Sequence, residues 1–147
     1  FISWDILITI ASAFAISRAM QNSGMADLVA QFAVGLSHSC SPVVLLAVVF
    51  VITNVFTELM TNNAAAALAF PLSLSIAQHM DVSPIPFFVT ICMAASASFS
   101  TPIGYQTNLI VQGVGNYRFA DFVRIGLPLN IISLIITVLV VPLLWPF

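Results

Sequence analysis

The sequence predicts an all-α integral membrane protein, and its composition and the lengths of its apolar stretches carry that prediction. Of the 147 residues, 61% are hydrophobic and 5% are charged. A soluble globular domain carries about 25% charged residues, so this chain cannot cover a water-facing surface. Its apolar stretches approach or reach the roughly 20 helical residues that cross a bilayer. We therefore expect one membrane domain over residues 1–147, surrounded by lipid and crossing an inner or plasma membrane several times.

The few charged residues also exclude whole classes of partner. Lysine is absent, and the basic residues form no run that could bind nucleic acid, so we expect no nucleic-acid partner. The chain begins at Phe1 rather than at a methionine, and nothing like a signal peptide precedes the first apolar stretch. We therefore expect the chain to be a piece of a longer polypeptide.

The first elements expected are a membrane span and a surface helix. Residues 1–20 are long enough to cross the bilayer, with Arg18 near one boundary. Residues 25–36 place Asp27 and Gln31 on one helical face, which is typical of a short helix lying along the membrane surface.

A dense run of polar side chains then interrupts an apolar region. Residues 57–63 read TELMTNN, between apolar residues 42–56 and an alanine-rich stretch that continues to about residue 79. Neither flank comfortably spans a bilayer alone, and polar groups at membrane depth need partners. We expect a re-entrant helical hairpin over about residues 42–80, with the polar run at its tip. A single long kinked helix is the alternative.

A second break follows in the next apolar stretch. Residues 100–104 contain Pro102 and Gly104, which cannot both continue a regular helix. This pattern predicts a discontinuous transmembrane helix over about residues 84–114. We expect Thr101 to cap its second half, with Pro102 at the first helical position.

The last expected span covers about residues 125–145 and ends at Trp145. Arg118 and Arg124 precede it, so the positive-inside tendency places that end in the cytoplasm. The hairpin would then open from the outer face of the membrane.

Broken helices present partial backbone charges inside a membrane. The first hairpin arm ends in unpaired carbonyls, which suit a cation such as Na⁺. The second arm begins with free N–H groups near Asn62, which suit an anion, and Thr61 is a good N-cap residue. Two polar breaks this close together are typical of a secondary transporter. The alternative is that neighbouring helices satisfy both breaks and that no ligand binds.

Glu58 is the one acidic residue deep in the apolar part of the sequence. It could pair with a charge from elsewhere in the protein, carry a proton, or brace the tip by accepting backbone N–H groups. We favour bracing because nothing nearby in the sequence marks a proton path.

Metal and catalytic sites are not expected. The cysteines and histidines lack the spacing of a metal site, so we expect no metal beyond a coupling cation, and no cofactor. These residues are His38, Cys40, His79 and Cys92. No hydrolytic motif is found, so we do not expect an enzyme.

Residues 57–65 (TELMTNNAA) and 101–108 (TPIGYQTN) resemble the divalent anion:sodium symporter family, in particular its bacterial sulfate-type, citrate-transporter-like branch. The resemblance covers essentially the whole chain and implies that it is the second of two inverted repeats. It further implies that the N-terminal half of the same permease is its partner, and that the full-length protein is a homodimer. The family transports by moving the hairpin domain against a scaffold, in elevator fashion.

The resemblance assigns roles to residues at both breaks. The family's Ser-Asn-Thr motif falls on Thr61, Asn62 and Asn63, and its substrate-facing loop falls on Thr101 and Pro102. Asparagine at position 63 replaces the family's threonine, which weakens the expectation of a dicarboxylate.

A cation site is also implied by the resemblance. It would draw on Thr57, Asn62 and the backbone carbonyls of Met60 and Ser100. Glu58 and the polar side chains after the second break are candidate supporting residues. The latter are Gln106, Thr107 and Asn108.

The expected function is cation-coupled uptake of a small anion such as sulfate or a di- or tricarboxylate. Na⁺ is the expected coupling cation and H⁺ the alternative. Residues 101–105 superficially resemble a potassium filter, so an ion-channel subunit is a rival, although Pro102 removes a backbone donor. A non-transporting membrane scaffold is the second rival.

Overall fold

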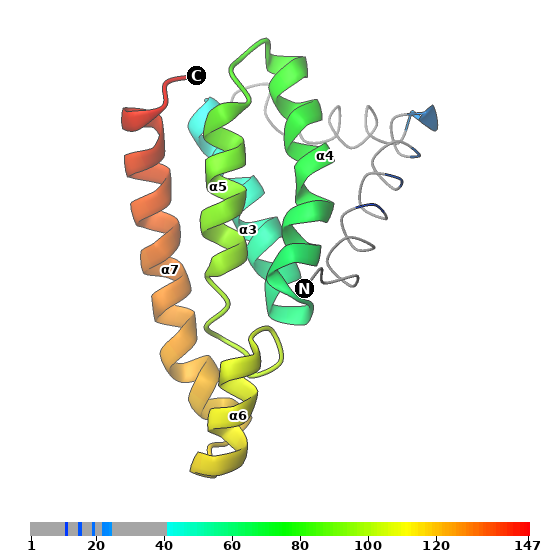
Figure 1. Ribbon diagram of the computed structural model, residues 1–147. Helices are drawn as coiled ribbons and strands as arrows, with labels where there is room; N and C mark the ends of the chain where they lie inside the picture. The colour runs from blue at the N-terminus through cyan, green and yellow to red at the C-terminus, as the bar shows by residue number, and fades with distance from the viewer. Residues whose placement is uncertain (1–10, 12–14, 16–18, 20–21, 25–40) are drawn as a thin grey trace, which may run out of the picture.

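The computed structural model describes residues 11, 15, 19, 22–24 and 41–147 (Figure 1). The expected first span over residues 1–20 and surface helix over residues 25–36 lie largely outside the described residues. Arg18, Asp27, Gln31, His38 and Cys40 lie outside them too. From residue 41 onward the chain forms helices and connecting segments without a strand, which confirms the all-α prediction. The helices are α3 (Pro42–Leu59), α4 (Asn62–Met80), α5 (Ile85–Ser96), α6 (Gln106–Gly115) and α7 (Phe119–Leu144).

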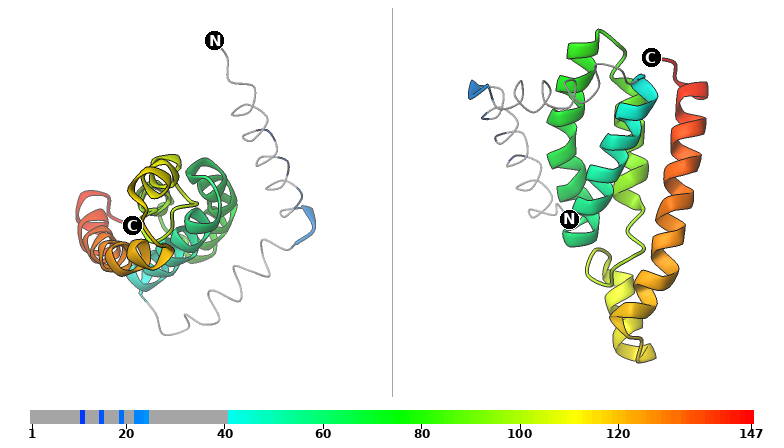
Figure 2. Two further views of the ribbon diagram at one scale, coloured as in Figure 1. Left: turned by 90° about the horizontal axis from the view of Figure 1, so that it is seen from below. Right: turned by 180° about the vertical axis from the view of Figure 1, so that it is seen from behind.

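Helices α3, α4 and α5 pack against one another, and α7 runs beside α3 and α5 over the height of the group (Figures 1 and 2). The start of α3, the end of α4, the start of α5 and the C-terminus all lie at the same end of the molecule (Figure 1). Helix α6 and the start of α7 lie at the opposite end. The break between α5 and α6 is therefore held at the level of the α3–α4 turn.

Two residues separate α3 from α4, so the pair is an antiparallel helical hairpin. Pro42 stands in the first turn of α3, where its missing N–H costs no helical bond. Helix α3 continues through Thr57 and Glu58 to Leu59, beyond the expected end at residue 56, and ends where Met60 is extended. Its 18 residues give it a length of about 27 Å.

The N-terminus of α4 agrees with the expected capping. The Thr61 hydroxyl accepts a hydrogen bond from the Ala64 N–H at 3.4 Å. Helix α4 then continues through Pro71 to Met80. It ends where Asp81 adopts a left-handed conformation, and the Val82 N–H bonds to the Ala77 carbonyl at 3.1 Å.

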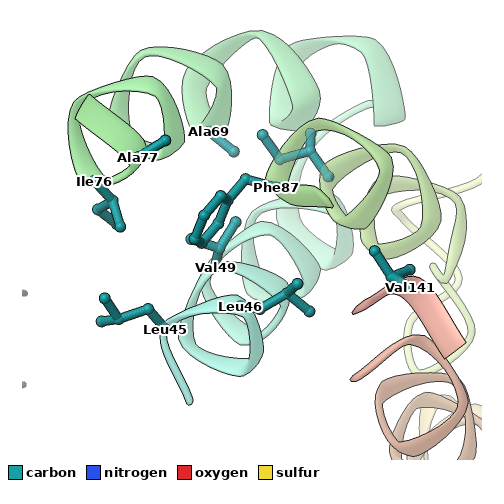
Figure 3. Close-up of a cluster of buried hydrophobic side chains, with 9 residues drawn as sticks. Leu45, Leu46, Val49, Ala69, Ile76, Ala77, Phe87 and Val141 are labelled. Carbon is teal, nitrogen blue, oxygen red and sulfur yellow. The ribbon is translucent and has the colours of Figure 1, made fainter. Parts of the chain in front are cut away.

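The core lies between α3, α4 and α5. The Phe87 side chain is fully buried and extends from α5 toward Val49 of α3 (Figure 3). Ala69 and Ala77 face it from α4, and their small side chains allow close approach of the helices. The cluster consists of Leu45, Leu46, Val49, Ala69, Ile76, Ala77, Phe87, Ile91 and Val141.

Two of the described helices, α3 and α7, are long and apolar enough to cross a membrane. The expectation that neither flank of the polar run spans a bilayer alone is therefore wrong for α3, because this helix continues through Thr57 and Glu58 to Leu59. Helix α7 has 26 residues and a length of about 39 Å. It begins at Phe119 rather than near residue 125, because the Asp121 carboxylate accepts the Arg118 N–H at 2.9 Å and closes its first turn.

The second break is longer than the sequence predicts. Helix α5 ends at Ser96 rather than at residue 99, and α6 begins only at Gln106. The expectation that Thr101 caps this helix, with Pro102 at the first helical position, is therefore wrong. The side chains and carbonyls of the intervening residues bond to α3 instead, and those bonds hold the segment in an irregular conformation.

Candidate site at the two helix breaks

The end of α3 lies directly against the segment between α5 and α6, called here the break segment (residues 97–105). Five hydrogen bonds join α3 to the end of α5 and this segment, between residues 38 to 43 positions apart in the sequence. They are Asn54 Nδ2 to Ala97 O (2.6 Å), Thr57 Oγ1 to Ala95 O (2.7 Å), Ser98 Oγ to Thr57 O (3.2 Å), Ser100 N to Glu58 Oε1 (2.8 Å) and Thr101 Oγ1 to Glu58 O (2.7 Å). The two polar breaks found in the sequence therefore meet.

Gly104 makes this close approach sterically possible. A Cβ atom at Gly104 would overlap the Ser98 hydroxyl and the backbone carbonyl of Thr57. The absence of a side chain lets the break segment lie on the last turn of α3. The backbone of the break segment can therefore come close enough to α3 for Ser98 and Thr101 to bond to its last carbonyls.

Three oxygens converge at Thr57. Its side chain is fully buried, and Oγ1 lies 2.8 Å from Asn62 Oδ1 and 2.7 Å from the Ala95 carbonyl oxygen. A hydroxyl has a single proton, so it cannot donate to both acceptors at once. The group is rich in oxygen and poor in donors, an arrangement that suits a hard cation.

Glu58 accepts a backbone N–H, as a bracing residue would, but it braces the break segment rather than the hairpin tip. Its Oε1 accepts hydrogen bonds from the Ser100 N–H and from Asn130 Nδ2, each at 2.8 Å. Glu58 is 9% exposed, and no donor within the described structure reaches its Oε2. The carboxylate therefore ties α3 both to the break segment and to α7.

The other predicted residues surround the hairpin turn. Met60 is the C-cap residue of α3, and Thr61 is the exposed N-cap residue of α4. Asn62 and Asn63 are the first two residues of α4, and Asn63 is exposed. The turn thus places an exposed helix N-terminus beside the oxygens at Thr57.

In the break segment, the Thr101 hydroxyl also accepts the Gly104 N–H at 3.3 Å, and Pro102 is buried. Asn108 supports this conformation from α6, since its Nδ2 donates to the carbonyls of Ser98 and Thr101, each at 3.2 Å. Thr107 is exposed on α6. Gln106 is the first residue of α6, and its side chain lies outside the described part of the structure.

Sequence reasoning missed several residues that build this site. Asn54 and Asn130 are polar side chains within long apolar stretches. Such residues mark a structural or functional site in a membrane segment, so the sequence could have identified both. Ser98 and Gly126 carried no comparable signal, because their roles depend on contacts with distant backbone.

A cavity of about 310 Å³ lies below the break, between α6 and α7. It is lined by Phe99, Asn108, Val111, Tyr117, Asp121, Phe122, Ile125, Gly126 and Leu129. Most of these side chains are apolar and one is acidic, so the cavity does not suit an anion.

Comparison with known proteins shows the family of this chain. A family model described as citrate transporter matches residues 1–146. The chain belongs to the citrate transporter family. This confirms the resemblance found in the sequence, and the family consists of transporters rather than enzymes.

Three relatives illustrate the range of this family. An uncharacterized transporter of Synechocystis, sll0640, is 39% identical over 98% of this chain, and a probable sodium/sulfate cotransporter 3 of Chlamydomonas reinhardtii is 38% identical over 88%. A sodium-dependent dicarboxylate transporter, SdcS, of Staphylococcus saprophyticus is 28% identical over 97%. The matched region spans 24%, 15% and 27% of the length of these relatives, respectively.

Proposed function

We propose that this chain forms one repeat of a secondary active transporter that couples a cation, Na⁺, to the uptake of a small anion. The observation that carries the proposal is the contact between Thr57 Oγ1 and Asn62 Oδ1 beside the exposed N-terminus of α4. A cation and an anion then have adjacent places in one structure. The names of the sodium/sulfate and dicarboxylate relatives support the same pair of ligands.

The proposed cation ligands are Thr57, Asn62 and the backbone carbonyls of Met60 and Ser100. Thr57 Oγ1 and Asn62 Oδ1 are 2.8 Å apart, so one small ion could contact both oxygens. Met60 follows the last turn of α3, where the carbonyl end of the helix carries partial negative charge. A positive ion beside Met60 would be attracted to this end of the helix and to the oxygens of Thr57 and Asn62.

The proposed anion site lies at the start of α4, where Thr61, Asn62 and Asn63 would supply the donors. Thr101 and Pro102 would border this site from the break segment. The first turn of α4 presents free N–H groups and the positive end of a 19-residue helix, which together favour negative charge. The exposed Asn63 side chain adds an amide donor that suits sulfate or a carboxylate.

Asn62 connects the two ligands, because its side chain contacts Thr57 while its backbone opens α4. A cation bound at Asn62 Oδ1 would order the turn that presents N–H groups to the anion. Binding of either ligand would then favour the other, which is the thermodynamic requirement for coupling.

The remaining parts of the proposal concern the whole protein. The hairpin α3–α4 is re-entrant and opens at the outer face of an inner or plasma membrane. The N-terminal half of the same permease completes the site, the full-length protein is a homodimer, and the site crosses the bilayer by an elevator movement.

Uptake by the full-length protein in proteoliposomes tests this function. Sulfate, succinate, citrate and phosphate would each be offered with and without an inward Na⁺ gradient. We expect Na⁺-driven uptake of one of them, abolished by Asn62→Ala. Ser96→Ala is the control, since its hydroxyl bonds only to the Cys92 carbonyl of the same helix at 2.9 Å and should leave uptake unchanged.

Other results would change the proposed coupling ion or the proposed function. Uptake that ignores Na⁺ but follows a pH gradient would replace the coupling ion with H⁺. A Na⁺ or K⁺ conductance without anion uptake would favour a channel subunit. If no anion is taken up and Asn62→Ala has no effect, a membrane scaffold becomes the better explanation.

A further inference from the structure

One face of α7 contacts the break segment at Ser100, whose backbone carbonyl is one of the proposed cation ligands. Gly126 and Asn130 are four residues apart and therefore lie on the same side of this helix. A Cβ atom at Gly126 would overlap the Phe99 carbonyl and crowd the Ser100 Cα. The break segment therefore rests on the backbone of α7 at Ser100.

Asn130 fixes the same residue through hydrogen bonds. Its Nδ2 donates to Ser100 Oγ and to Glu58 Oε1, each at 2.8 Å, and Asn130 is 8% exposed. Ser100 N in turn donates to Glu58 Oε1 at 2.8 Å. Asn130, Glu58 and Ser100 thus form a closed triangle of three hydrogen bonds.

This triangle constrains Ser100 on every side except its carbonyl. The Ser100 N–H and hydroxyl are both engaged, and its Cα rests against Gly126. The carbonyl is the group assigned above to the coupling cation. Its direction therefore depends on the amide of Asn130, which contacts no proposed ligand atom itself.

Asn130 acts in this arrangement as a donor only. Both of its hydrogen bonds use Nδ2, and no donor in the described part of the chain reaches its Oδ1. Replacing the amide by a carboxylate of the same shape would remove the donor to Glu58 Oε1 and set two carboxyl groups against each other, while the Ser100 hydroxyl could turn to donate to the new carboxylate.

We propose that Asn130 is a positioning residue for the coupling cation, acting through Glu58 and the Ser100 backbone. This inference rests on the proposed function, because it assumes that the Ser100 carbonyl contacts the cation. A residue with that role should change the cation concentration needed for half-maximal uptake. It should change the KM for the anion little when the cation is saturating.

The test uses full-length protein in proteoliposomes, with Na⁺ varied at saturating anion and the anion varied at saturating Na⁺. For Asn130→Asp we expect a tenfold or larger rise in half-maximal Na⁺ and less than a threefold change in anion KM. Asn130→Ala removes both hydrogen bonds without adding a carboxyl group. It should also raise half-maximal Na⁺, by a smaller factor than Asn130→Asp, with anion KM again nearly unchanged.

Thr137→Val is the matched control on α7. Thr137 is 2% exposed, and its hydroxyl has no hydrogen-bond partner in the described structure, so its loss should change neither constant. The inference is overturned if Asn130→Asp behaves like Thr137→Val, if anion KM changes as much as half-maximal Na⁺, or if Asn130→Ala leaves half-maximal Na⁺ at the wild-type value. Wild-type uptake without cation dependence would overturn the proposed function as well, so the two failures are distinguishable.

Discussion

Thr57→Val removes one buried hydroxyl at the centre of the proposed cation site while keeping the shape of the side chain. The hydroxyl lies 2.8 Å from Asn62 Oδ1 and 2.7 Å from the Ala95 carbonyl oxygen and has one proton, so the substitution takes the donor away from one of these two acceptors. It also removes one of the oxygens offered to the cation. We therefore expect weaker cation binding rather than a general loss of fold.

The magnitude follows from the burial of the site. Thr57 is fully buried, and a contact between a polar group and a charged one contributes about 1.5–3 kcal/mol, which the bound state would lose with the hydroxyl oxygen. Because about 1.4 kcal/mol is a factor of ten in an equilibrium constant, half-maximal Na⁺ should rise by roughly 10-fold to 150-fold. The substitution weakens the binding of the cation and not that of the anion, so anion KM at saturating Na⁺ should change much less.

Thr53→Val is the control that separates this effect from simple loss of a buried hydroxyl. Thr53 is also fully buried and lies one turn earlier on α3, but its hydroxyl bonds to the Val49 carbonyl of the same helix at 2.7 Å. Its replacement leaves the contacts between α3 and the break segment intact. Half-maximal Na⁺ should therefore stay near the wild-type value.

The assay is Na⁺-dependent uptake by purified full-length protein, with the melting temperature of each variant measured in detergent. Equal effects of the two substitutions on half-maximal Na⁺ would refute the reasoning. So would a Thr57→Val protein that binds Na⁺ normally but melts at a much lower temperature, since the hydroxyl would then serve only the fold.

Two further predictions concern packing and orientation. Gly126→Ala should destabilise the protein by about 1–3 kcal/mol, seen as a lower melting temperature, because its Cβ would overlap backbone of the break segment. Gly113→Ala, on α6 with open space around the added Cβ, should be neutral or slightly stabilising. If both variants melt alike, the contact at Gly126 is not restrictive. In a variant lacking native cysteines, Asn116→Cys should react with an impermeant thiol reagent from the cytoplasmic side and Ser83→Cys from the outside. Labelling of both from one side would exclude the proposed orientation.

The sequence predicted the parts of the fold that depend on local composition. The hairpin turn, the Thr61 cap and the existence of a second break follow from polar or helix-breaking residues within apolar stretches. Helix ends were less predictable, because long-range bonds determine them. Helix α5 stops at Ser96 since the following carbonyls and hydroxyls bond to α3, and no local signal marks that position.

The candidate site shows the same division. The bracing role of Glu58 could be inferred because a lone carboxylate in an apolar stretch needs donors. Its partner Asn130 is 72 residues away in the sequence, and only the packing of α7 against the break brings the two together. Gly126 could not be recognised in advance, because its importance lies in backbone that approaches from another helix.

The hydrogen bonds between α3 and the break segment bear on how such a protein could diversify. Several of these bonds involve backbone atoms as donor or acceptor. Thr57 and Glu58, the α3 residues that take part in them, are buried. Thr61 and Asn63, by contrast, are exposed at the mouth of the turn. Exchanges at Asn63 could change which anion is accepted while the buried frame stays the same, whereas Thr61 also caps α4 and could be exchanged only for another capping residue. Selection for a new nutrient would then act mainly on exposed residues that make no contact within the frame.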